Sequence, residues 1–243
     1  MGLHHVVVER WSRRGGPLHA IDARAKLGAL LAFLIGVSTT PTRAQIAFGA
    51  YAALLLAAMA ASGLPLVGLL RRAALVLPFS ATFAVISWWS GEPLRALALA
   101  ERSFLSGLAA LLLIATTPLT PILAAFETIG APRMIILVIQ FLYRYLFVIS
   151  EQAQHMRLAA QSRHGSGSAR TLLFSPSLFS ASAGALGVLF ARSWERADGI
   201  YQAMLARGFS GRFATAAQPH FHVADLVFFG GVLAACVGIR LAA

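Results

Sequence analysis

The chain has 243 residues, of which 58% are hydrophobic and only 12% are charged. These proportions exclude an ordinary soluble globular protein of this length and indicate an integral membrane protein. Lys and Arg together number 20 against 9 Asp and Glu, and the net charge of +11 suits anionic lipid or an acidic protein surface. Nucleic acid is the least suitable partner, because no basic stripe alternates with exposed aromatic residues.

Five charge-free apolar runs predict membrane spans in chain order. They are residues 27–42, 44–70, 73–91, 103–126 and 226–239. A hydrocarbon core of about 30 Å needs about 20 apolar residues, so the first and last runs are short and rely on flanking basic side chains that reach the interface. Trp88 and Trp89 close the third run, as interfacial aromatic anchors do.

The basic residues predict the orientation of these spans, because loops rich in Lys and Arg stay in the cytoplasm. The N-terminal segment and the Arg71-Arg72 loop are both basic, whereas the loop at 92–102 balances acids and bases, as an outside loop does. Residues 127–221 hold nine Arg against four acids. An even number of spans must precede this region if it is cytoplasmic, so the apolar stretches at 134–150 and 177–191 are predicted not to cross.

Two long helices are predicted inside this basic region. Residues 133–164 follow a proline, which favours a helix start, and contain neither Gly nor Pro; the second helix, residues 177–207, also follows a proline and stops at Gly208. At 1.5 Å per residue each helix is about 46 Å long. The first halves of both helices are apolar enough to lie against or in the membrane, and the second halves carry the charges.

Each long helix is predicted to end on an arginine close to a glycine. Gly165 and Gly208 are available as left-handed caps, and Arg163 or Arg207 in the last turn complements the negative end of the helix dipole by about 0.3 to 1 kcal/mol. Ordinary capped helix ends are therefore one interpretation. Docking is the other, and it favours a carboxylate on another protein, because phosphate prefers helix N-termini and the chain has no G-x-x-x-x-G-K-[ST] loop.

These features resemble the transmembrane T component of energy-coupling factor transporters, the EcfT/CbiQ family, and most closely the CbiQ branch of cobalt or nickel uptake. In that family two cytoplasmic coupling helices end in Ala-Arg-Gly-type signatures. The signature at residues 206–208, Ala206-Arg207-Gly208, matches fully, whereas Ser162-Arg163-His164 keeps only the arginine. Further similarity lies in LHAIDARAKL at residues 18–27 and in Tyr-Arg-Tyr at 143–145, so the resemblance covers nearly the whole chain.

The resemblance implies an all-α polytopic membrane protein with about five transmembrane helices and two long cytoplasmic or interfacial coupling helices. It implies an L-shaped arrangement, with room for a short third coupling helix. The expected parts are a cytoplasmic N-terminal segment at 1–26, a four-helix transmembrane part at 27–121, a coupling-helix domain at 122–221 and a final transmembrane helix at 222–243. The expected location is the bacterial inner membrane, with the N-terminus in the cytoplasm.

The implied function is that of a scaffold in an importer, not of an enzyme. Two ABC-type ATPase subunits, which bind the ATP and Mg, would dock at the two arginine signatures, and a CbiM-like membrane subunit would capture the substrate. The chain itself is expected to bind no cofactor. Cobalt, nickel and a vitamin all stay open as the substrate.

Small residues recur on one face of two predicted helices and indicate close helix packing. The two sets are Gly28, Ala32 and Gly36 in the first span, and Ala183, Gly187 and Ala191 in the second long helix. Static packing and a sliding contact are both compatible with this pattern.

Two other function classes are weaker on sequence grounds. A substrate-conducting permease needs a polar cavity among its spans, and an intramembrane enzyme needs catalytic polar groups at membrane depth, so the charge-free runs count against both. Metal ligation by His4, His5, His220 or His222 is not expected, because histidine pairs in polar tails are usually solvated. Cys236 is the single cysteine, which excludes an internal disulfide and a cysteine-based metal cage.

Overall fold

The computed structural model describes residues 16, 18–63, 66–164, 176–210 and 222–242. The regular elements within these residues are all helical, so the predicted all-α class is confirmed. The chain divides into two compact units, one made of residues 1–131 and 219–243 and the other of residues 132–218. The short helix after residue 118 belongs to the first unit, and the domain boundaries expected from the resemblance stay a prediction.

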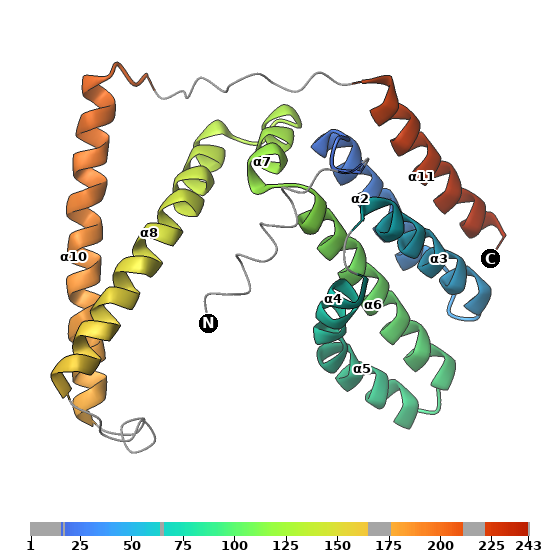
Figure 1. Cartoon of the computed structure of the whole chain (residues 1–243). Helices are drawn as coiled ribbons and strands as arrows, with labels where there is room; N and C mark the ends of the chain where they lie inside the picture. The colour runs from blue at the N-terminus through green and yellow to red at the C-terminus, as the bar shows by residue number, and fades with distance from the viewer. Residues whose placement is uncertain (1–15, 17, 64–65, 165–175, 211–221, 243) are drawn as a thin grey trace. The chain divides into compact units, whose positions relative to one another are not determined.

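The first unit is a bundle built around one central helix. Its elements are α2 (Ala23–Thr39), α3 (Gln45–Ser62), α4 (Leu66–Ala73), the 3-10 turn η1 (Ala74–Val76), α5 (Leu77–Trp89), α6 (Pro93–Thr116), α7 (Leu119–Thr128) and α11 (Val223–Leu241). Helix α6 contacts α2, α3, α4 and α5, while α11 comes from the end of the chain to pack along α2 (Figure 1). Segments far apart in sequence therefore share one core.

The core of the first unit lies where α2, α3, α6 and α11 meet. Phe33 packs edge-on against Tyr51 with the ring centroids 5.5 Å apart, and the Tyr51 hydroxyl donates to the carbonyl of Cys236 over 3.3 Å. Cys236 is itself buried. Because the lipid-facing surface of such helices is also apolar, close packing rather than hydrophobicity alone determines which side faces inward.

The small residues on α2 are places of close helix approach. A Cβ on Gly28 would lie 2.9 Å from the Phe229 ring of α11, and a Cβ on Gly36 would lie 3.0 Å from the Tyr51 hydroxyl. Ala32 is half-buried between them. This face of α2 is therefore occupied by neighbouring helices of the same unit.

Several helix boundaries differ from the predicted apolar runs. Gly63 takes a left-handed φ of +66° and ends α3, so run 44–70 is divided, and extended backbone at Thr117 and Pro118 separates α6 from α7. Residues 93–102, predicted as an outside loop, form the first turns of α6, because Pro93 is well suited to the start of a helix.

Four described helices are long and apolar enough to cross a membrane, namely α3, α6, α11 and residues 133–159 of the first long helix. The pair α4 and α5, bent by 51°, makes a fifth if it counts as one span. The chain is thus a multi-pass membrane protein, with four such helices among the described residues, or five if the bent pair is one span, against the five predicted. The membership differs, because α2 is absent from this set and the first long helix is present. Length and hydropathy do not decide which of the two crosses, so that part of the topology stays a prediction.

The second unit contains the two predicted long helices. They are α8 (Arg133–His164), with 32 residues, and α10 (Pro176–Ala206), with 31 residues. Figure 1 shows them as an antiparallel pair, and residues 138–152 of α8 and 193–204 of α10 line a shared groove of about 390 Å³. The C-terminal ends of α8 and α10 therefore lie at opposite ends of this unit.

Candidate functional site

The end of α10 is a fully formed helix cap. Gly208 has a φ of +77°, and its N–H donates to the carbonyl of Leu205 over 2.9 Å. The N–H of Phe209 donates to the carbonyl of Met204 over 3.0 Å. These two bonds make the Schellman arrangement, which satisfies carbonyls that the helix end would otherwise leave unpaired. The predicted cap at Gly208 is confirmed.

The second signature is presented to solvent by this cap. Ala206, Arg207 and Gly208 are all exposed. Among the described residues, no acidic side chain forms an ion pair with Arg207. Its guanidinium can therefore form a bidentate contact with a carboxylate on another protein. The same exposure is compatible with an ordinary helix end, so the local geometry permits docking without requiring it.

The first signature occupies the last turn of α8, which continues through His164. Ser162 is exposed, and its hydroxyl donates to the carbonyls of Leu158 over 3.2 Å and Ala159 over 3.0 Å. This hydroxyl is thus satisfied within its own helix. The side chains of Arg163 and His164, and the proposed cap at Gly165, lie outside the described residues.

The structure does not bring the two signatures together. Helices α8 and α10 are antiparallel (Figure 1), so their C-terminal ends, which carry the two signatures, lie at opposite ends of the helix pair. A helix of 31 residues is about 46 Å long at 1.5 Å per residue. A single binding pocket cannot hold both arginines, and any docking through them uses two separate sites.

The small residues on α10 behave differently from those on α2. Ala183, Gly187 and Ala191 are all exposed, and a Cβ on Gly187 would meet no atom within 4 Å. This face is not used for packing within the described part of the second unit. Its proposed packing role stays a prediction.

A buried carboxylate joins α2 to α11, and the sequence analysis did not find it. Asp225 Oδ1 accepts the backbone N–H of Asp22 over 2.8 Å, although 203 positions separate the two residues. Asp225 Oδ2 accepts the N–H of His222 over 2.8 Å, completing a capping box at the start of α11. His222 is therefore a helix cap. The sequence offered only one signal for this contact, namely an acid close to the start of the first and of the last apolar run, Asp22 and Asp225.

Lys26 extends this polar cluster to the end of α6. Its Nζ donates to the carbonyl of Thr116 over 3.3 Å and to the hydroxyl of Thr117 over 3.1 Å, and the side chain is buried. Lys26 precedes the first predicted span. Burial lowers its pKa from 10.5 to about 8, although Asp22 and Asp225 favour the charged form. Lys26 is therefore still mostly positively charged at neutral pH.

The described residues offer no metal centre, since no group of three or more His, Cys, Asp or Glu side chains gathers among them. His4, His5 and His220 lie outside the described residues, so the expectation for them stays a prediction. The structural features that remain are a helical membrane bundle and, at the end of α10, an exposed helix end that carries Arg207. The several helices that are long and apolar enough to cross a membrane define the class of this chain as a multi-pass membrane protein.

The family model described as CbiQ, cobalt transport protein, matches residues 16–219. The chain therefore belongs to the CbiQ family of cobalt transport proteins. It is a component of a transporter in a family defined by transport rather than by catalysis.

Several relatives show how far this similarity extends. An uncharacterised protein of Methanocaldococcus jannaschii is 24% identical over 247 residues, which cover 92% of this chain and 82% of the relative. Another from the same organism is 29% identical over 110 residues, covering 44% and 38% of the two chains. A putative fused cobalt transport protein CbiMQ of Methanocorpusculum labreanum is 29% identical over 99 residues, covering 41% and 16%. The chain thus spans well under half the length of the last two.

Proposed function

We propose that this chain is the transmembrane scaffold of an energy-coupling factor importer in the cell membrane, with its N-terminus in the cytoplasm. It transmits ATP-driven motion from two ABC-type ATPase subunits to a separate membrane subunit that captures cobalt or nickel ions. The observation that carries the proposal is the pair of arginine signatures at opposite ends of α8 and α10, in a member of a cobalt transport family. The relative named as a fused CbiMQ protein supports a CbiM-like capture subunit.

Two docking sites one helix length apart suit two ATPase subunits. Each ATPase would hold one arginine through a carboxylate, and ATP and Mg would be bound by the ATPases. Closing of the ATPase pair would then change the separation of the two helix ends. A long uninterrupted helix keeps its backbone hydrogen bonds throughout, so it carries such a displacement as a stiff element. The coupling itself requires two arrangements of α8 and α10 that both partners bias.

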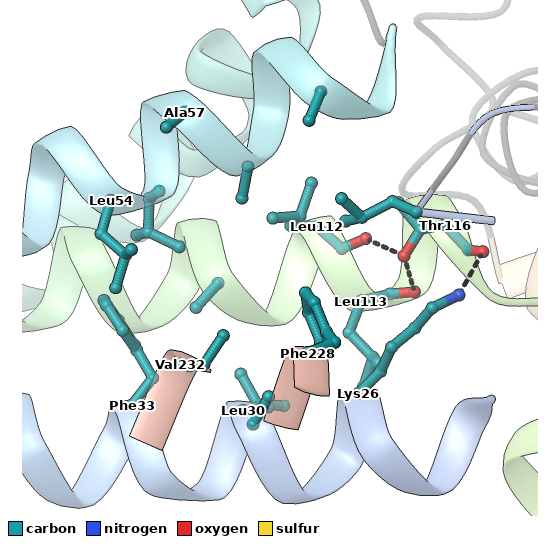
Figure 2. Close-up of a pocket in the computed structure, with 16 residues that line it drawn as sticks. Lys26, Leu30, Phe33, Leu54, Ala57, Leu112, Leu113, Thr116, Phe228 and Val232 are labelled. Atoms are coloured by element: carbon teal, nitrogen blue, oxygen red, sulfur yellow. Dashed lines mark hydrogen bonds between the residues drawn. The ribbon is translucent and has the colours of Figure 1, made fainter. Parts of the chain in front are cut away.

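The interior of the first unit gives little support to the alternative of a substrate-conducting permease. The cavity between α2, α3, α6 and α11 is lined almost entirely by apolar side chains (Figure 2). Its charged lining residue, Lys26, repels a metal cation. Pathways for ions instead use acidic or carbonyl groups at membrane depth.

Co-purification with the cognate ABC ATPases tests the scaffold role. The wild-type chain in detergent is expected to retain both ATPases, and the double variant Arg163→Glu plus Arg207→Glu is expected to lose them, because each reversal places like charges opposite each other. Arg207→Glu alone should reduce retention more than Arg163→Glu alone, since the signature around Arg207 is complete. Arg192→Glu, an exposed reversal on α10 outside either signature, is the matched control and should retain both.

The result that contradicts the scaffold role is a wild-type chain that retains no ATPase, or a double variant that retains as much as the wild type. The two arginines would then be ordinary helix-end residues. Uptake by vesicles that contain the ATPases, this chain and the capture subunit distinguishes labelled cobalt, nickel and vitamin as cargo.

A further inference from the structure

An apolar, partly open cavity of about 350 Å³ lies between helices of the first unit (Figure 2). Helices α2, α3, α6 and α11 all contribute to its wall. The larger side chains around it are Leu30, Phe33, Leu54, Leu112, Phe228 and Val232. A cavity of this size left empty would deprive its lining of van der Waals partners, so it suits an apolar occupant.

The cavity is elongated along the helices and has one polar end. Its lining residues run from 26 to 33 on α2, from 54 to 61 on α3 and from 109 to 116 on α6. Each of these segments rises about 10 Å at 1.5 Å per residue. Figure 2 shows Lys26 and Thr116 at one end and Phe33 and Leu54 at the other.

Lys26 is suited to an anionic group at that end. It is only 5% exposed, and two of its three N–H donors are used by Thr116 and Thr117. The two nearby carboxylates are held by backbone N–H groups, and no ion pair within 4 Å joins Lys26 to either of them in the described part of the chain. Lys26 therefore keeps a positive charge and one donor for a ligand.

We propose that this cavity holds the first part of one acyl chain of an anionic phospholipid from the surrounding bilayer, with the phosphate group at Lys26. Lys26 directly precedes the first apolar run, which places the polar end of the cavity at the level of the lipid head groups. The apolar part extends from there along the spans, in the direction that an acyl chain follows. A water-soluble ligand would need more polar partners than this lining supplies.

Lipid retention by the purified full-length chain tests this site. After extensive washing in mild detergent, lipid extraction and mass spectrometry should find about one anionic phospholipid per wild-type chain. Ala58→Phe fills the cavity and should lower this retention about tenfold. Lys26→Gln keeps the cavity and should lower the ratio of phosphatidylglycerol to phosphatidylethanolamine several-fold. Ala84→Phe, in a different groove between α5 and α6, is the matched control and should retain lipid as the wild type does.

A second measurement covers the case in which Ala58→Phe fails to fold. Adding phosphatidylglycerol to the delipidated wild type should raise its Tm more than phosphatidylcholine does, and Ala61→Leu, a smaller filling of the same cavity, should remove this difference. Equal retention by well-folded wild type and Ala58→Phe would overturn the proposal. So would a wild-type chain that carries no bound lipid, a free fatty acid or only zwitterionic lipid.

Discussion

At the scale of single residues, Asp225 makes the contact that sequence patterns are least able to show. Its two oxygens accept N–H groups from Asp22 and His222, and the residue is buried. Hydrogen bonds to a buried carboxylate are stronger than those between neutral groups, and losing one leaves a buried donor unpaired. This carboxylate therefore stabilises the contact between the first and last helices of the bundle.

We expect Asp225→Ala to lower the free energy of unfolding by roughly 2 to 4 kcal/mol, because two hydrogen bonds to a charged group are lost. Asp225→Asn keeps one carbonyl oxygen as an acceptor and should lose about half as much. Thermal unfolding of the purified chain in detergent measures both effects. Arg95→Ala removes an exposed ion pair with Glu92 and should leave the Tm unchanged. An unaltered Tm in Asp225→Ala would show that this contact does not stabilise the bundle.

At the scale of secondary-structure elements, the C-terminal end of α10 depends on one glycine. Gly208 has a φ of +77°, a conformation that costs a residue with a Cβ roughly 1 to 2 kcal/mol. The cap determines where the helix stops and so where Arg207 is presented. Docking through Arg207 should therefore be sensitive to a change that leaves the arginine itself intact.

Gly208→Ala is expected to loosen the last turn of α10 and to weaken ATPase retention without removing a charge. Amide hydrogen exchange at residues 204–209 should become faster, because the two capping hydrogen bonds are strained. Gly199→Ala in the same helix is the control, since a Cβ there meets no atom within 4 Å and alanine favours a helix. Unchanged exchange in Gly208→Ala, or equal loss of retention in both variants, would contradict this role of the cap.

The first turns of α6 show that a helix can begin before the apolar run from which it was predicted. Glu101 and Arg102 directly precede the apolar run 103–126, yet both lie within the helix and are half-buried. Arg102 donates to the carbonyl of Thr40 and lies 5.8 Å from the centroid of the Phe48 ring. Partners outside α6 thus stabilise the charged side chain of Arg102 within the helix, although a hydropathy pattern would end the apolar segment at this residue.

At the scale of the whole molecule, two features of the sequence make opposite predictions for whether α8 crosses the membrane. Its residues 133–159 are apolar enough to cross the membrane, whereas the distribution of arginines predicts that α8 stays on the cytoplasmic side. The two arrangements differ in where the ends of this segment lie. The scaffold function requires α8 to stay on the cytoplasmic side, because the arginine signatures must reach cytoplasmic ATPases.

Labelling of single cysteines from either side of the membrane distinguishes these arrangements. In a Cys236→Ser background, Met134→Cys and Gln154→Cys are expected to react from the cytoplasmic side, as is Asp198→Cys on α10. Trp89→Cys, at the end of α5, should react from the outside. Met134→Cys and Gln154→Cys reacting from opposite sides would show that α8 crosses and would overturn the predicted topology.

The sequence by itself determined the class of protein and the positions at which its two long helices begin and end. Composition established a helical membrane protein, and proline and glycine positions predicted both long helices to within a residue at each end. The cap at Gly208 was predictable for the same reason, since backbone conformation at a glycine depends on a few neighbouring residues. The family resemblance also rested on short local motifs.

Only the tertiary structure decided which distant residues meet. The bond between Asp22 and Asp225, the close approach of Gly28 to Phe229 and the apolar cavity all join segments that lie far apart in the chain. The antiparallel arrangement of α8 and α10 likewise separates Arg163 from Arg207, although the sequence shows two similar helix ends. Helix periodicity reports which face of one helix is apolar, but in a membrane both lipid and protein accept such a face, so packing alone selects the neighbour.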